Sequence, residues 1–192
     1  MAMRLHEIHP SVVHFPLTLL PASLALDAVG RLTGSRGLMS AARLLMPAAA
    51  VSGVVAGVAG LIAQESVHAE GEGHPALVTH RNLNLALVGL TAVLAGARMR
   101  KDQPAWGYLL AGAAGVVGMG YTAYLGGKLT YSHGVGVERS GGVRSESAEI
   151  RRGSVAHALV LAVRLVGRAL LTVVRELRRG EIAPLLKRET SV

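Results

Sequence analysis

The sequence predicts an all-α integral membrane protein, a bundle of four transmembrane helices followed by a basic amphipathic helix. Of its 192 residues, 51% are hydrophobic, and charged residues avoid four long windows while crowding the gaps between them. The first window, residues 12–29, approaches the roughly 20 helical residues that cross a bilayer core. These two observations argue against a single soluble domain of ordinary composition.

The expected spans cover residues 12–29, 44–63, 78–97 and 104–125. Pro16 fits the first turn of the first span, where its missing N–H costs little. The apolar run that starts at Leu83 is too short to cross a membrane, so the third span has to begin near Val78. This start places His80 about one turn inside the membrane zone. Residues 30–43 and 64–79 are expected to be loops, and the glycine-broken segment 126–137 is not expected to continue the fourth helix.

The C-terminal part differs from the four-helix domain, residues 1–137, in composition. A linker is expected over residues 138–152, followed by helical periodicity from 153 to 179 and a tail to 192. Arg164, Arg168, Arg175 and Arg178 lie opposite an apolar stripe, which predicts a helix on the membrane surface or on a partner. Most of the net charge of +8 comes from residues 126–192, which carry twelve Lys/Arg and six Asp/Glu, and a basic segment beside a membrane domain usually binds anionic lipid. Nucleic acid is not expected as a partner, because there is no motif for it and few aromatics for base stacking.

The histidines are confined to one side of the predicted topology. The eight histidines are His6, His9, His14, His68, His74, His80, His133 and His157. With four crossings, the termini and the loop between the second and third spans share one face, and every histidine belongs to these segments. The other two loops are rich in arginine, which places them in the cytoplasm. We therefore expect a multi-pass protein of the bacterial inner membrane with its histidines facing the periplasm or exterior.

The sequence-based hypothesis for function is a b-type haem held by two neutral imidazoles, in a protein that transfers electrons. The chain has no cysteine, so a metal or cofactor has to use histidine, carboxylate or backbone ligands. His14 and His80 are expected at similar depth, and His9 and His133 are the alternative axial ligands. The expected propionate partners are Lys128, Arg81 and Tyr131. A quinone or a redox protein would be the electron-transfer partner.

Other interpretations remain open. The same four histidines, His9, His14, His80 and His133, are candidate ligands for Zn or Cu. Alternatively each histidine only caps a helix or shapes a turn, and the chain is a non-enzymatic subunit or scaffold that docks a partner or anionic lipid. No nucleophile is paired with a base, so no independent catalytic activity is expected. Asp27 is expected to pair with Arg31, four residues further along the same helix face, and a proton relay is the alternative role.

Three motifs resemble those of a bacterial family of small four-helix membrane proteins catalogued as a domain of unknown function. The first runs from His6 to Pro16, with His9-Pro10 and Val13-His14-Phe15-Pro16 as its core. The others are His80-x-x-Leu83-Asn84 and the stretch from Gly126 to Val137. The resemblance covers residues 6–137 and implies four transmembrane helices, with no established activity. Glu7 stands where such proteins often have proline.

Overall fold

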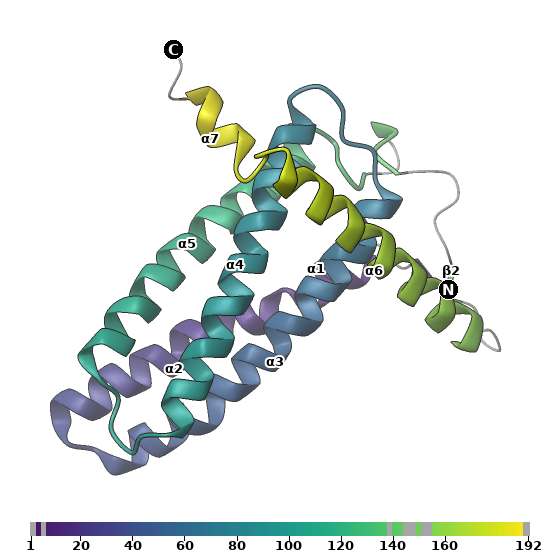
Figure 1. Cartoon of the computed structure of the whole chain (residues 1–192). Coiled ribbons are helices and arrows are strands. Elements are labelled where there is room, and N and C mark those ends of the chain that lie inside the picture. The colour runs from purple at the N-terminus through teal and green to yellow at the C-terminus, as the bar shows by residue number, and fades with distance from the viewer. Residues whose placement is uncertain (1–2, 5–6, 138–139, 144–148, 151–154, 190–192) are drawn as a thin grey trace. The chain divides into compact units, whose positions relative to one another are not determined.

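The computed structural model describes residues 3–4, 7–137, 140–143, 149–150 and 155–189, and it is helical almost throughout (Figure 1). The helices are α1 (Ile8–Val12), α2 (His14–Thr33), α3 (Arg36–Ser66), α4 (Gly73–Met99), α5 (Trp106–Tyr131), α6 (Val155–Arg178) and α7 (Pro184–Glu189). The strands β1 (Met3–Arg4) and β2 (Glu149–Ile150) form one two-residue antiparallel pair. The predicted all-α class is confirmed.

Among the described residues, five helical segments, rather than four, are long and apolar enough to cross a membrane. They comprise α1 with α2 as one span of 26 residues, then α3, α4 and α5, and finally residues Ala156–Arg178 of α6. The arginines of this last helix predict a surface position, whereas by length and composition alone the helix qualifies as a span.

The helices extend beyond the apolar windows that predicted them. The expected loop over residues 30–43 is wrong, because only Gly34 and Ser35 separate α2 from α3. Gly34 ends α2 in the left-handed conformation, with φ of 70°, which lets the chain turn within two residues. The loop expected over 64–79 shrinks to residues 67–72, and α5 continues through Gly126 and Gly127 to Tyr131. Helical hydrogen bonding therefore continues through polar and glycine-containing ends that hydropathy excludes.

The chain forms two compact units. Unit 1 comprises Met1–Ser11, Gly57–Leu83 and Thr122–Val192, and unit 2 comprises Val12–Ala56 and Asn84–Tyr121. Unit 2 brings together α2 and parts of α3, α4 and α5. Its core consists of Leu20, Leu24, Met46, Ala49, Leu94, Ala95 and Tyr108.

Unit 1 holds the remaining ends of α3, α4 and α5 together with α1, α6 and α7. Its loops meet in a small backbone network. Val67 pairs with Val143 in an isolated bridge, and the N–H groups of His68 and Gly136 both donate to the carbonyl of Gly142, each at 3.1 Å. Of the predicted linker 138–152, residues 138–139, 144–148 and 151–152 lie outside the described residues.

The turn between α2 and α3 makes a testable prediction. Gly34→Ala should destabilise the protein by about 1 kcal/mol, since an L-residue pays this cost in the left-handed region. Gly37→Ala is the matched control, because Gly37 is helical with open space around it and alanine favours helix. Thermal unfolding in detergent, followed by circular dichroism, should show a lower midpoint only for Gly34→Ala. Equal midpoints for the two variants would contradict this role of Gly34.

Candidate functional site

The most deeply buried charged side chains described in unit 2 form an ion pair between α2 and α4. Asp27 is 0% exposed and Arg98 is 1% exposed. The Nε of Arg98 donates to both carboxylate oxygens of Asp27, at 2.9 and 2.8 Å, and the hydroxyl of Tyr108 on α5 donates to Oδ2 at 3.0 Å. An acid within a membrane helix is costly unless it is compensated in this way.

Arg98 also satisfies two backbone carbonyls. Its Nη2 donates to the carbonyl of Met39 on α3 at 2.7 Å, and its Nη1 donates to that of Lys101 at 2.5 Å. All three guanidinium nitrogens therefore have acceptors within unit 2. The cluster of Asp27, Arg98 and Tyr108 links four helices, and this complete bonding indicates a structural lock rather than a reactive centre.

The expected pairing of Asp27 with Arg31 is wrong. Arg31 instead donates to the carbonyl of Pro104 at 2.6 Å, and its guanidinium carbon lies 4.8 Å from the ring centre of Trp106. Spacing along one helix identifies possible neighbours but cannot reveal a better partner on another helix. The signal that the sequence did offer was Arg98 itself, a cation next to an apolar run.

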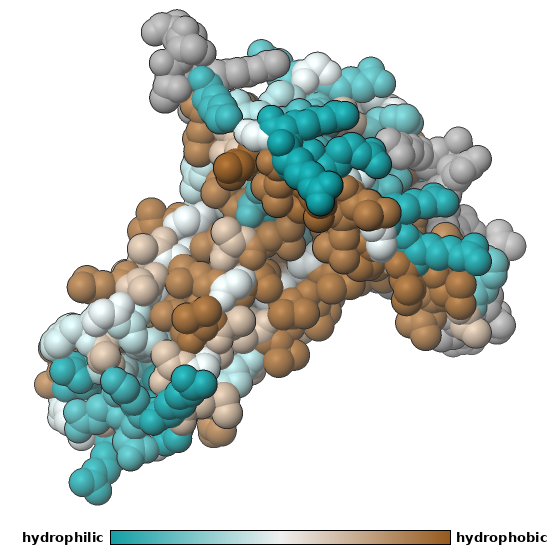
Figure 2. Space-filling view, in the orientation of Figure 1, coloured by the Kyte–Doolittle hydropathy of each residue, from teal (hydrophilic) through white to brown (hydrophobic). Residues whose placement is uncertain are grey.

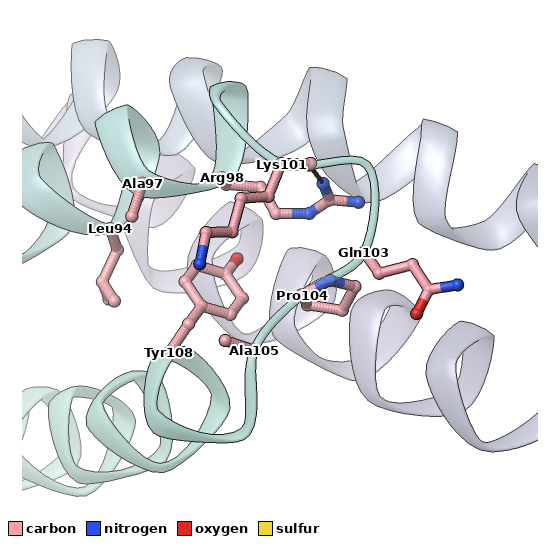
Figure 3. Close-up of a pocket in the computed structure, with 8 residues that line it drawn as sticks. All are labelled: Leu94, Ala97, Arg98, Lys101, Gln103, Pro104, Ala105 and Tyr108. Atoms are coloured by element: carbon pink, nitrogen blue, oxygen red, sulfur yellow. Dashed lines mark hydrogen bonds between the residues drawn. The ribbon is translucent and has the colours of Figure 1, made fainter.

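A cavity of about 230 Å³ lies beside this cluster (Figure 3). Its lining residues come from the end of α4, the following turn and the start of α5: Leu94, Ala97, Arg98, Lys101, Gln103, Pro104, Ala105 and Tyr108. In Figure 3 the Lys101 side chain extends toward Tyr108, whereas Gln103 points away. Ligand sites commonly exceed about 300 Å³, and each guanidinium nitrogen of Arg98 already has an acceptor. The cavity therefore offers little to a ligand.

His80 of unit 1 is held in a defined orientation by a hydrogen bond to α5. Its Nδ1 lies 2.9 Å from the carbonyl oxygen of Thr122 on α5. A carbonyl can only accept, so Nδ1 carries the proton in this bond and Nε2 carries the lone pair of the neutral ring. This hydrogen bond is the usual way in which a protein orients an imidazole ligand. A Cβ added at Gly126 would approach Cε1 of His80 to 3.1 Å, so the ring lies directly against the α5 backbone.

His9 has a similar environment in the same unit. It lies on α1, and a Cβ added at Gly60 of α3 would come within 3.2 Å of its Cε1 and Nδ1. His9 is also close enough to His80 for the two rings to interact electrostatically. Each imidazole therefore lies against a glycine of a neighbouring helix, and both belong to unit 1.

The remaining predicted ligands are placed differently. His14, the first residue of α2, is exposed and belongs to unit 2. His133 is half-buried beside Gly73 in unit 1, and His6 lies outside the described residues. Within the described part of the chain, no three His, Cys, Asp or Glu residues lie close enough together to hold a metal ion.

The predicted propionate partners also differ in availability. Arg81, 8% exposed, forms an ion pair with Glu176 of α6 and donates to Gln64 and Asn82. Tyr131 is 91% exposed, and Lys128 is half-buried in the last turn of α5. Sequence reasoning missed Glu176, a lone acid within the arginine-rich helix that had drawn attention only for its cations.

The two ion pairs of unit 2, buried Asp27–Arg98 and exposed Arg43–Asp102, should contribute differently to stability. Asp27→Asn leaves the Arg98 charge buried without a counter-ion and should destabilise the protein by about 3–5 kcal/mol. Asp102→Asn removes the exposed pair with Arg43, which is 2.7 Å long with side chains 43% and 95% exposed, and should cost at most about 1 kcal/mol. Unfolding midpoints of both variants in the same detergent test this order. Similar decreases in the unfolding midpoint for the two variants would show that the buried Asp27–Arg98 pair does not hold the helices of unit 2 together.

Comparison with known proteins adds one family and no characterised relative. No curated protein and no solved structure matches the chain. A family model described as a predicted membrane protein matches residues 5–139, which include the three motifs, α1 to α5, the Asp27–Arg98 pair and His80. The predicted family resemblance is confirmed, as is association with a lipid bilayer, and the chain belongs to the DUF2231 family of predicted multi-pass membrane proteins.

Proposed function

We propose that unit 1 binds a b-type haem through His80 and His9, and that the protein transfers electrons without catalysing a reaction of its own. The observation that carries this proposal is the bond between His80 Nδ1 and the Thr122 carbonyl. It selects the tautomer in which Nε2 is the basic nitrogen, as an axial ligand requires. His9 is the favoured second ligand because it belongs to the same unit as His80 and interacts with its ring electrostatically. His133, also in unit 1, is the alternative, whereas His14 belongs to unit 2.

Haem is favoured over zinc or copper by the number of ligands that each needs. A protein zinc site uses three or four side-chain ligands, and the described residues hold no such group. Two axial imidazoles suffice for a bis-histidine haem, and Gly60 and Gly126 keep bulky side chains away from both rings. When bound, the haem would supply one-electron redox chemistry.

The protein's own residues would orient the ligands and hold the charged edge of the group. Lys128, half-buried at the end of α5, is the favoured propionate partner, because Glu176 already neutralises Arg81. We place this end at the outer face of the bacterial inner membrane, where a quinone or a redox protein can reach it. Arg36 at the start of α3 and Arg100 and Lys101 after α4 are exposed, which fits a cytoplasmic position of these two connections.

The haem proposal predicts a visible spectrum. Detergent-purified protein should show Soret and α bands that sharpen on reduction with dithionite, at about one haem per chain. Replacing either histidine removes half of the iron's protein coordination, so His80→Asn and His9→Ala should lose these bands. The side-chain amide introduced by His80→Asn has its N–H near the position of Nδ1 and can still donate to the Thr122 carbonyl, which separates loss of the ligand from loss of the hydrogen bond. His68→Ala, at an exposed position, is the control that should keep the bands. A colourless protein would overturn the proposal.

A second candidate function is that of a non-enzymatic membrane subunit with four spans and α6 on the membrane surface. Arg164 and Arg168 support the surface position of α6. Both are exposed, and they flank the midpoint of this helix, which runs from Val155 to Arg178. If α6 crossed the bilayer, each would cost roughly 2.5–3.5 kcal/mol near its centre. At the interface these arginines stay hydrated while the apolar face enters the lipid.

The surface position of α6 can be tested with single cysteines, because the natural chain has none. Ala156→Cys and Arg179→Cys, at exposed sites at the two ends of α6, should react with a membrane-impermeant maleimide from the same side of sealed vesicles. Glu72→Cys and Gln103→Cys, in the turns after α3 and α4, are the references for the two opposite sides. Reaction of the two α6 cysteines from opposite sides would show instead that α6 is a fifth span.

A further inference from the structure

Helix α6 presents three faces along its length. The first is buried within unit 1 and consists of Ala169 at 0% exposure, Val173 at 7% and Glu176 at 9%. The other two faces are exposed, one apolar and one cationic. A helix that buries only one narrow seam against its own protein has further surface for another partner.

The exposed apolar face runs for about five turns. Leu159, Val163, Leu170, Val174 and Leu177 form it, and each is 44–66% exposed. Their spacing of three, four and seven residues keeps them on one side of the helix, over roughly 27 Å at 1.5 Å per residue. Hydrophobic residues follow one edge of α6 and hydrophilic residues the other (Figure 2).

The cationic face lies beside the apolar one, and its arginines have no acidic partner among the described residues. It consists of Arg164, Arg168, Arg175 and Arg178, all exposed. None of the four forms an ion pair within the part of the chain that the structure describes. The only acid of α6, Glu176, is turned away from them and bonded to Arg81. Four exposed positive charges along one row can therefore bind an external row of anions.

The C-terminal end of α6 is held against the start of α4. Besides the pair of Glu176 with Arg81, the Asn82 amide donates to the carbonyls of Glu181 and Ile182 at 3.1 and 2.8 Å. The N–H of Leu185 donates to the Thr79 hydroxyl at 3.1 Å. Helix α4 has 27 residues, about 40 Å of helix, which is longer than the roughly 30 Å core of a bilayer. Its first turns, and with them this end of α6, can therefore lie at headgroup depth.

We propose that α6 binds the surface of an anionic phospholipid bilayer, with its apolar face in the acyl region and its four arginines on lipid phosphates. A bilayer surface supplies an apolar layer and a row of anions side by side over the whole length of the helix. Charge complementarity thus selects anionic lipid over neutral lipid. This proposal rests on the surface position of α6 and is independent of haem binding.

The experiment compares how strongly anionic and neutral lipids gather around α6 in the full-length protein. The only tryptophan is removed by Trp106→Phe and a new one is placed on the apolar face by Val163→Trp. This protein is reconstituted in phosphatidylcholine nanodiscs with a minor fraction of brominated lipid, either phosphatidylglycerol or phosphatidylcholine. Bromine quenches tryptophan at contact range, so the ratio of the two quenching efficiencies reports the local enrichment of the anionic lipid.

We expect brominated phosphatidylglycerol to quench roughly two- to fivefold more than brominated phosphatidylcholine at low salt, because basic residues near a bilayer attract anionic headgroups. Raising the salt concentration should reduce the difference. Replacing all four arginines of α6 with glutamine should abolish it, whereas the pair Arg36→Gln and Arg100→Gln in unit 2 should leave it unchanged.

The other outcomes overturn the proposal. Equal quenching by the two lipids would mean that α6 contacts lipid without preference for charge. Absence of quenching by both would mean that a protein covers the apolar face. The cysteine experiment decides separately whether α6 lies on the surface, so a failure of lipid selectivity is distinguishable from a failure of the surface position.

Discussion

The buried pair of Asp27 and Arg98 is the interaction on which unit 2 depends. Both side chains are withdrawn from solvent and from lipid, so each can remain charged only if the other and the nearby backbone compensate it. The bonds of Arg98 to carbonyls of Met39 and Lys101 and that of Tyr108 to Asp27 complete this compensation. A shift of any one of the four helices would leave a buried charge without one of its partners. The ion pair therefore specifies how the four helices align.

Unit 1 also contains a buried charge that is compensated by a counter-ion and hydrogen bonds, but from different residues. Arg81 is buried at the start of α4 and is neutralised by Glu176 of α6, which lies 95 positions further along the chain. The neighbouring Thr79 and Asn82 bond the backbone that follows α6. These contacts explain why α6, an amphipathic helix with most of its apolar side chains exposed, has a defined attachment at one end. They also leave its arginines facing away from the protein.

Hydropathy predicted the class, the order and the approximate centres of the first four long helices, because the requirement for apolar length is a property of each segment alone. It failed at helix ends, where hydrogen bonding continues through polar residues, as at Arg36 and Tyr131. Sequence spacing also failed for partners. It predicted Arg31 as the partner of Asp27, whereas the real partner is 71 residues away. Such a choice depends on tertiary packing, which no local pattern records.

For the histidines, too, the sequence predicted one property, whereas another depends on tertiary contacts. Their confinement to one predicted face was visible in the sequence, but the distinction between them was not. His14 opens α2 and is exposed, while His80 is set against α5 by the Thr122 carbonyl. Only the second has a defined tautomer, and that property depends on a residue 42 positions away.

Glycine explains how a polar side chain reaches a helix backbone in both units. In α5, Gly126 lies one turn after Thr122, and a Cβ there would crowd the His80 ring. In α2, a Cβ at Gly30 would meet Met39 Cγ at 2.8 Å, at the residue whose carbonyl accepts from Arg98. Each glycine permits an approach that brings a backbone acceptor to a nitrogen donor. Small residues in membrane helices are usually credited with helix packing, and here the same closeness also orients the imidazole and the guanidinium.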